Sequence, residues 1–149
     1  MRRVVKNEYA ELQCSSSGDA VYLKWFPPNE RMSESEFIEL IDLLFSTIEV
    51  FNSRVLYVDA LHFNYYISEK VTQTIKLYLE SCEIKSLDIV MSENLLGKNS
   101  IQQLIKQIKS IESALHVYES CDEGAFWFSL KSYSTPVKFQ PESSLSQIE

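Results

Sequence analysis

The chain has 149 residues, of which 45% are hydrophobic and 23% are charged, and its net charge is −7. This length and composition are typical of one globular domain with a single hydrophobic core, and they exclude a chain that is disordered throughout. The acidic balance repels phosphate backbones and anionic lipid surfaces. We therefore expect neither nucleic acid nor a membrane among its partners.

The distribution of polar residues predicts a cytoplasmic protein. No run approaches the roughly 18 consecutive apolar residues of a membrane span, and polar residues between positions 6 and 11 interrupt what would be the apolar core of a secretory signal. Cys14, Cys82 and Cys121 are widely spaced and show no pairing typical of zinc or a redox dithiol. We expect reduced thiols, no metal and no other cofactor.

The N-terminal third predicts a β-hairpin. Apolar and polar residues alternate over 10–14 and again over 21–26, and the segment between them has turn chemistry around Gly18. Pro27 and Pro28 then end the second strand, because proline cannot donate a hydrogen bond to a ladder.

Helical spacing begins at Ser33, which forms a predicted capping box with Glu36. The expected buried stripe of this first helix is Phe37, Ile41, Leu44, Ile48 and Phe51. The next segment, 55–58, has almost no polar alternation, which favours a parallel strand covered on both faces and ending at Asp59.

The rest of the chain continues to alternate between helix and strand. We expect a second helix from Ser68, a strand at 87–91, a third helix opened by a capping box of Ser100 and Gln103, and a strand at 115–118. A short aromatic helix at 124–128 should lie against the sheet, because its large apolar area must be buried.

These elements predict one α/β domain over residues 1–131, followed by an extended tail at 132–149. The sheet should be mixed and mostly parallel, with about five strands, an N-terminal hairpin and about four flanking helices. The exposed edge of the hairpin makes a homodimer a possible assembly.

Four landmarks resemble the STAS-like proteins, the small cytosolic relatives of anti-sigma-factor antagonists. They are Trp25, the segment Met-Ser-Glu-Ser-Glu-Phe at 32–37, the strand 55–59 with Phe63 after it, and the segment Glu-Gly-Ala-Phe-Trp-Phe at 123–128. The resemblance covers roughly 20–130 and implies a mixed sheet flanked by helices, no cofactor, and function by docking onto another protein.

The resemblance also implies where docking occurs. In the better-known antagonists the docking surface surrounds the start of the helix after the central strand, where an Asp-Ser pair followed closely by Gly carries a regulatory phosphoserine. The matching stretch here, 65–70, is Tyr-Tyr-Ile-Ser-Glu-Lys, which keeps Ser68 but lacks the Asp and the Gly. Ser68 is thus a weak candidate phosphosite, and it is also a helix cap, a role that needs only its hydroxyl.

The segment after the central strand supplies the candidate partner-binding residues, because aromatic side chains in a loop at strand ends are enriched at interfaces. These candidates are His62, Phe63, Tyr65, Tyr66, Ser68 and Glu69. In the alternative interpretation Phe63 and Ile67 are buried under the sheet and the tyrosines alone are exposed.

The sequence predicts no catalytic residues. Asp59 and His62 could form an acid–base pair, but no nucleophile elbow or phosphate-binding loop accompanies them, so we expect Asp59 to bind backbone amides. We expect His116 to be a half-buried strand residue. The favoured function is a non-enzymatic protein-docking module, and the alternative is binding of a small apolar ligand in a pocket between sheet and helices.

Overall fold

The computed structural model describes residues 2–108 and 114–119. Within these ranges the chain forms six β-strands, three α-helices and one short 3-10 helix. In chain order the elements are β1 (Arg2–Lys6), β2 (Ala10–Cys14), β3 (Ala20–Trp25), η1 (Pro27–Arg31), α1 (Glu34–Phe51), β4 (Val55–Asp59), α2 (Glu69–Ser81), β5 (Ser86–Val90), α3 (Leu95–Ile108) and β6 (Ala114–Tyr118).

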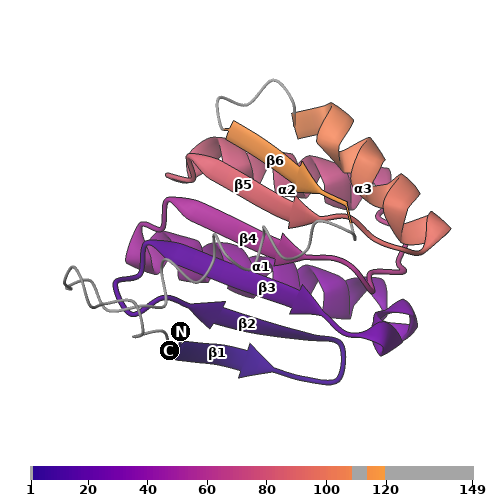
Figure 1. Cartoon of the computed structure of the whole chain (residues 1–149), viewed down its shortest axis with the longest axis horizontal. Helices are drawn as coiled ribbons and strands as arrows, with labels where there is room; N and C mark the ends of the chain where they lie inside the picture. The colour runs from indigo at the N-terminus through magenta and orange to yellow at the C-terminus, as the bar shows by residue number, and fades with distance from the viewer. Residues whose placement is uncertain (1, 109–113, 120–149) are drawn as a thin grey trace, which may run out of the picture.

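The strands lie in the sheet in the order in which they occur in the chain, from β1 to β6. β1, β2 and β3 pair antiparallel, whereas β3, β4, β5 and β6 pair parallel. Parallel strands joined by helices almost always make right-handed crossovers, and successive crossovers in one direction place every helix on the same side. Accordingly, α1, α2 and α3 cover one face of the sheet (Figure 1).

The strand count differs from the prediction of about five, because Arg2–Lys6 forms an additional strand. This charged segment pairs with β2 through Arg3 opposite Gln13 and Val5 opposite Leu12. Its side chains are mostly exposed, so it lacks the buried alternation by which a strand is recognised in a sequence. The edge strand that a homodimer would use is therefore β1, and its charges are typical of edges that resist pairing.

The central strand and the first helix agree with the prediction. β4 lies between β3 and β5, and Tyr57 is 2% exposed. The capping box of Ser33 and Glu36 is present at the start of α1. The core between helices and sheet includes Phe37, Ile41, Leu44 and Ile48; Phe51, the last residue of the predicted stripe, is exposed.

The third helix begins earlier than expected, at Leu95 rather than near Ser100. The carbonyl of Asn94 accepts the amide of Lys98, so the first helical turn lies upstream of the predicted capping box. Gly97, a weak helix former, lies within this turn, so helix propensity does not indicate that the helix starts there.

Several predictions concern residues outside the described ranges. They are the aromatic helix at 124–128, its capping residues Ser120 and Glu123, the tail at 132–149, and Cys121. Three α-helices are therefore described where about four were expected. None of the helices in the described ranges has the length and apolar character needed to cross a membrane.

Candidate functional site

The loop at 60–68, which joins β4 to α2, carries the predicted partner-binding residues. It starts where Asp59 ends β4, and Asp59 Oδ1 accepts the amide of Leu61 at 3.1 Å, as expected for a strand-end carboxylate. Phe63 and Ile67 are buried, whereas Tyr66 is 67% exposed. His62 and Tyr65 are half-buried.

An aromatic cluster lies beneath this loop. The ring of Phe63 is 5.0 Å from that of Trp25, and the ring of Tyr65 stacks on Phe37 at 4.8 Å. Trp25 and Phe37 also stack on each other at 5.7 Å. Phe63 and Tyr65 therefore both take part in packing. As in the alternative interpretation, Phe63 and Ile67 are buried and Tyr66 is exposed, whereas Tyr65 is half-buried.

Asn29, a residue that the sequence analysis did not select, fixes the N-terminal half of the loop. It is fully buried, and its Nδ2 donates to the carbonyls of Phe26 at 2.6 Å and His62 at 2.8 Å. Its Oδ1 accepts the amide of Asn64 at 2.8 Å. A buried amide with both ends bonded holds the backbone strongly, because breaking the bonds would leave buried polar groups without partners.

Two serines near α3 fix the other half of the loop. Ser92 Oγ donates to the carbonyl of Phe63 at 2.6 Å. Ser100 Oγ donates to the carbonyl of Tyr65 at 2.7 Å and accepts the amide of Ile67 at 3.2 Å. Ser100, which was predicted to cap the helix, is therefore a buried residue inside α3 whose hydroxyl binds the loop backbone.

The close approach of the loop to α3 requires a glycine. A Cβ on Gly97 would lie 1.7 Å from the carbonyl oxygen of Phe63. Any larger residue would push the loop away from α3 or the helix away from the sheet, because carbonyl and Cβ cannot share that space.

Ser68 caps α2, as predicted. Its Oγ accepts the amide of Val71 at 3.2 Å and donates to Glu34 Oε2 at 3.1 Å. A phosphate on Ser68 would lie close to the carboxylates of Glu34 and Glu69, and these like charges would repel it. The geometry favours the capping role.

Exposed apolar side chains flank a groove between α2 and α3. The groove has a volume of about 300 Å³ and is lined by Tyr66, Ile67, Glu69, Thr72, Leu96, Asn99, Ser100, Gln103 and Gln107. Leu95 and Leu96, which the sequence analysis did not select, are 75% and 45% exposed. We call Tyr66, Leu95, Leu96 and this groove the Tyr66 surface.

Acidic side chains lie beside Tyr65 and Asn64 in the loop, and Glu69 lines the groove of the Tyr66 surface. Desolvation raises the pKa of the Tyr65 hydroxyl, and the negative charges of Glu34 and Glu36 raise it further. Glu30 is also adjacent, because its Oε1 accepts Asn64 Nδ2 at 2.7 Å. A positively charged partner would therefore be attracted to this side of the molecule.

The acid–base pairing of Asp59 with His62, which the sequence analysis considered and did not favour, is not among the ion pairs of the described residues. Ion pairs in these residues join Arg3 to Glu11 and His116 to Asp88. The ring nitrogen of His116 is hydrogen-bonded, as expected, and its partner Asp88 was not selected from the sequence. The expectation that His116 is half-buried is wrong: its side chain is 54% exposed, because β6 is the last strand of the sheet in the described residues. In residues 2–108 and 114–119 no group of three His, Cys, Asp or Glu side chains could hold a metal ion.

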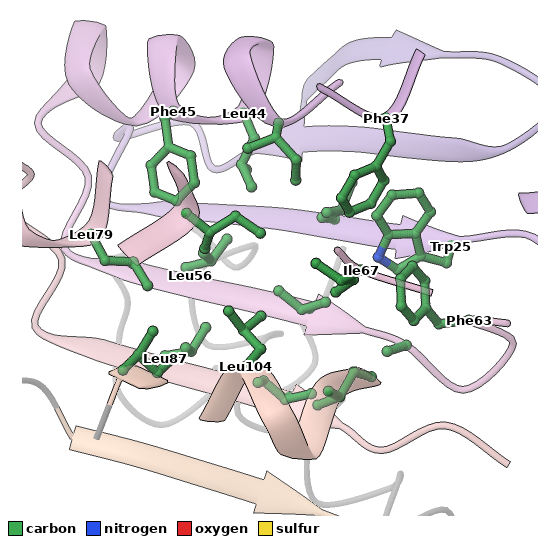
Figure 2. Close-up of a pocket in the computed structure, with 18 residues that line it drawn as sticks. Trp25, Phe37, Leu44, Phe45, Leu56, Phe63, Ile67, Leu79, Leu87 and Leu104 are labelled. Atoms are coloured by element: carbon green, nitrogen blue, oxygen red, sulfur yellow. The ribbon is translucent and has the colours of Figure 1, made fainter. Parts of the chain in front are cut away.

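A cavity in the core is the structural feature relevant to an apolar ligand. Figure 2 shows it between the sheet and the helices, with Trp25, Phe37 and Phe63 at one end. Its volume is about 80 Å³ and its lining is almost wholly apolar. Sites for drug-sized ligands are several times larger, so this volume suits a ligand of a few heavy atoms at most.

Comparisons of the chain with models of known protein families, with curated proteins and with solved structures gave no match.

Proposed function

We propose that the chain is a non-enzymatic protein-docking module that binds its partner with the Tyr66 surface. The observation that carries this proposal is a contrast within the loop. Tyr66 is 67% exposed, although the backbone of Tyr65 before it and of Ile67 after it is hydrogen-bonded to Ser100. A rigid loop that exposes a large aromatic side chain loses little entropy on binding, and preorganisation of this kind raises affinity.

The chemistry of the surface also supports docking. Tyr is enriched among the residues that dominate binding energy, and it works best beside apolar neighbours that exclude water. Leu96, which lines the same groove as Tyr66, provides such a neighbour, and the groove also offers amide side chains for hydrogen bonds. The surrounding carboxylates favour a partner whose contacting segment is basic with an apolar anchor.

A STAS-like regulatory role is part of this proposal. The support is positional: the Tyr66 surface adjoins the start of the helix after the central strand, which is where the resemblance implies docking. In this proposal Ser68 acts as a cap and does not serve as a phosphate switch, because its hydroxyl is already bonded to Glu34 and Val71.

Affinity capture from native cytosol with matched variants tests the proposal. The double variant Tyr66→Ala, Leu96→Ala removes the apolar part of the surface, and Leu77→Ala is the control, since Leu77 is 65% exposed on α2 outside the groove. We expect the double variant to lose a partner that the wild-type chain and Leu77→Ala both retain. Raising the salt concentration should also weaken capture of that partner.

Two results would contradict the proposal. One is capture of the same partners by the double variant at wild-type levels. The other is loss of capture in Leu77→Ala as well, which would indicate general apolar adhesion. Circular dichroism of each variant confirms that it is folded.

The alternative is binding of a small apolar ligand, and the 80 Å³ cavity favours it. Xenon is a suitable probe, because apolar cavities of comparable size take it up. Chemical-shift changes at Leu56 and Ile75, which line the cavity, would support this function. Unchanged shifts under xenon pressure would remove the support.

A further inference from the structure

The face of the sheet opposite the helices carries a polar network that docking does not use. The strand register aligns Tyr22, Tyr57, Asp88 and His116 in one row across β3, β4, β5 and β6. Asp88 is 4% exposed, so the network is built around a buried carboxylate.

Asp88 is bonded to three side chains. Its Oδ1 accepts Ser86 Oγ at 3.0 Å and lies 3.1 Å from His116 Nδ1, and its Oδ2 accepts the Tyr118 hydroxyl at 3.0 Å. A carboxylate has no proton to donate, so His116 must carry its proton on Nδ1. The Nε2 atom of the neutral ring then holds a free electron pair.

The His116 ring is accessible although its partner is buried. The side chain of His116 is 54% exposed, whereas that of Asp88 is 6% exposed. β6 is also the last strand in the sheet of the described residues. Burial, the hydrogen bond to Asp88 and its charge raise the pKa of Tyr118, which keeps that hydroxyl a donor that orients the carboxylate.

We propose that His116 is a phosphoryl acceptor that forms a phosphohistidine at Nε2. The Nε2 electron pair forms the N–P bond, and the bond from phosphorus to the leaving group breaks with its electrons on the leaving group. The donor is a small molecule with an activated phosphoryl group, such as an acyl phosphate or a phosphoramidate. The ring gains positive charge in this step, and Asp88 across the Nδ1 proton stabilises it.

Two observations favour group transfer over other roles of an Asp–His pair. A metal ion needs further ligands, and the described residues offer no third His, Cys, Asp or Glu beside this pair. A general base acts on a substrate that other groups hold, whereas a phosphoryl acceptor needs only an accessible nitrogen and a donor. The protein thus presents the parts that acceptance of a phosphoryl group requires.

Potassium phosphoramidate tests the proposal on the intact chain. The chain has two histidines, so His62 is an internal control; in the described residues no carboxylate pairs with its ring. We expect peptide mapping to show acid-labile phosphorylation of His116 about tenfold faster than of His62, and similar rates for both in urea. Comparable rates in the folded chain would overturn the proposal.

Variants and a tautomer measurement separate reactivity from simple exposure. Asp88→Asn should reduce the rate at His116 to that of His62, whereas Val117→Ala, at the exposed position next to His116 on β6, should leave it unchanged. Nitrogen NMR of the wild-type chain, taken where the ring is neutral, is a second measurement that does not depend on the folding of Asp88→Asn. The Nδ1–H tautomer is expected for His116, and the Nε2–H tautomer would overturn the proposal.

Discussion

Two neighbouring groups of apolar side chains differ in what they contact. The aromatic cluster of Trp25, Phe37, Phe63 and Tyr65 lies under the 60–68 loop, where the rings pack against one another. Tyr66, the residue after Tyr65, is 67% exposed, and Leu96 lines the same groove. The cluster stabilises the loop, so the Tyr66 surface can expose apolar groups without losing its shape. The following changes should separate these two roles.

The largest expected effect is on the aromatic cluster. Phe63→Ala removes a buried ring that contacts Trp25 at 5.0 Å between centroids, and it should lower the free energy of unfolding by about 3–5 kcal/mol. Denaturant unfolding measures this loss. A change below about 1 kcal/mol would show that the loop does not depend on the cluster.

Gly97→Ala should also destabilise the fold, although alanine is the better helix former by about 1 kcal/mol. The new Cβ would lie 1.7 Å from the Phe63 carbonyl, so α3 and the loop must separate, at a cost on the order of 2–3 kcal/mol. The change in melting temperature shows whether the variant is less or more stable than the wild-type chain. A more stable variant would mean that the contact between loop and α3 is looser than described.

Ser68→Ala should lower stability by about 1 kcal/mol, because the Val71 amide loses its acceptor. Partner capture should persist, and intact-mass analysis of the chain from its native cells should show no phosphate at Ser68. A phosphorylated Ser68, or a folded Ser68→Glu variant that no longer binds its partner, would restore the phosphate switch.

The smallest expected effect on stability is that of Tyr66→Ala. An exposed side chain contributes little to folding, so unfolding should change by less than about 0.5 kcal/mol while partner capture falls. Loss of stability comparable to that of Phe63→Ala would instead place Tyr66 in the same structural role as the cluster.

The local parts of the fold could be predicted from the sequence. The hairpin, the capping box at Ser33, the buried strand at Val55–Asp59 and the cap at Ser68 each depend on residues close together in the chain. Elements without a local signal were missed: β1 has mostly exposed side chains, and the start of α3 contains Gly97.

The site was predicted in part for the same reason. Aromatic composition identified the 60–68 loop, but which tyrosine is exposed depends on stacking with Phe37, a residue far away in the chain. Asn29 and Ser100 hold the loop through bonds to backbone more than 30 positions away, which no short pattern reveals. The sequence signal for Asp88 was its position as the single acidic residue in the apolar strand Ser-Leu-Asp-Ile-Val.

Oxidative footprinting of the chain bound to its captured partner tests the central claim most directly. Side chains at an interface are shielded from hydroxyl radicals, so the account predicts protection of Tyr66, Leu95 and Leu96 in the complex and unchanged oxidation of Leu77. Protection of Leu77 with Tyr66 still oxidised at the rate of the free chain would contradict it.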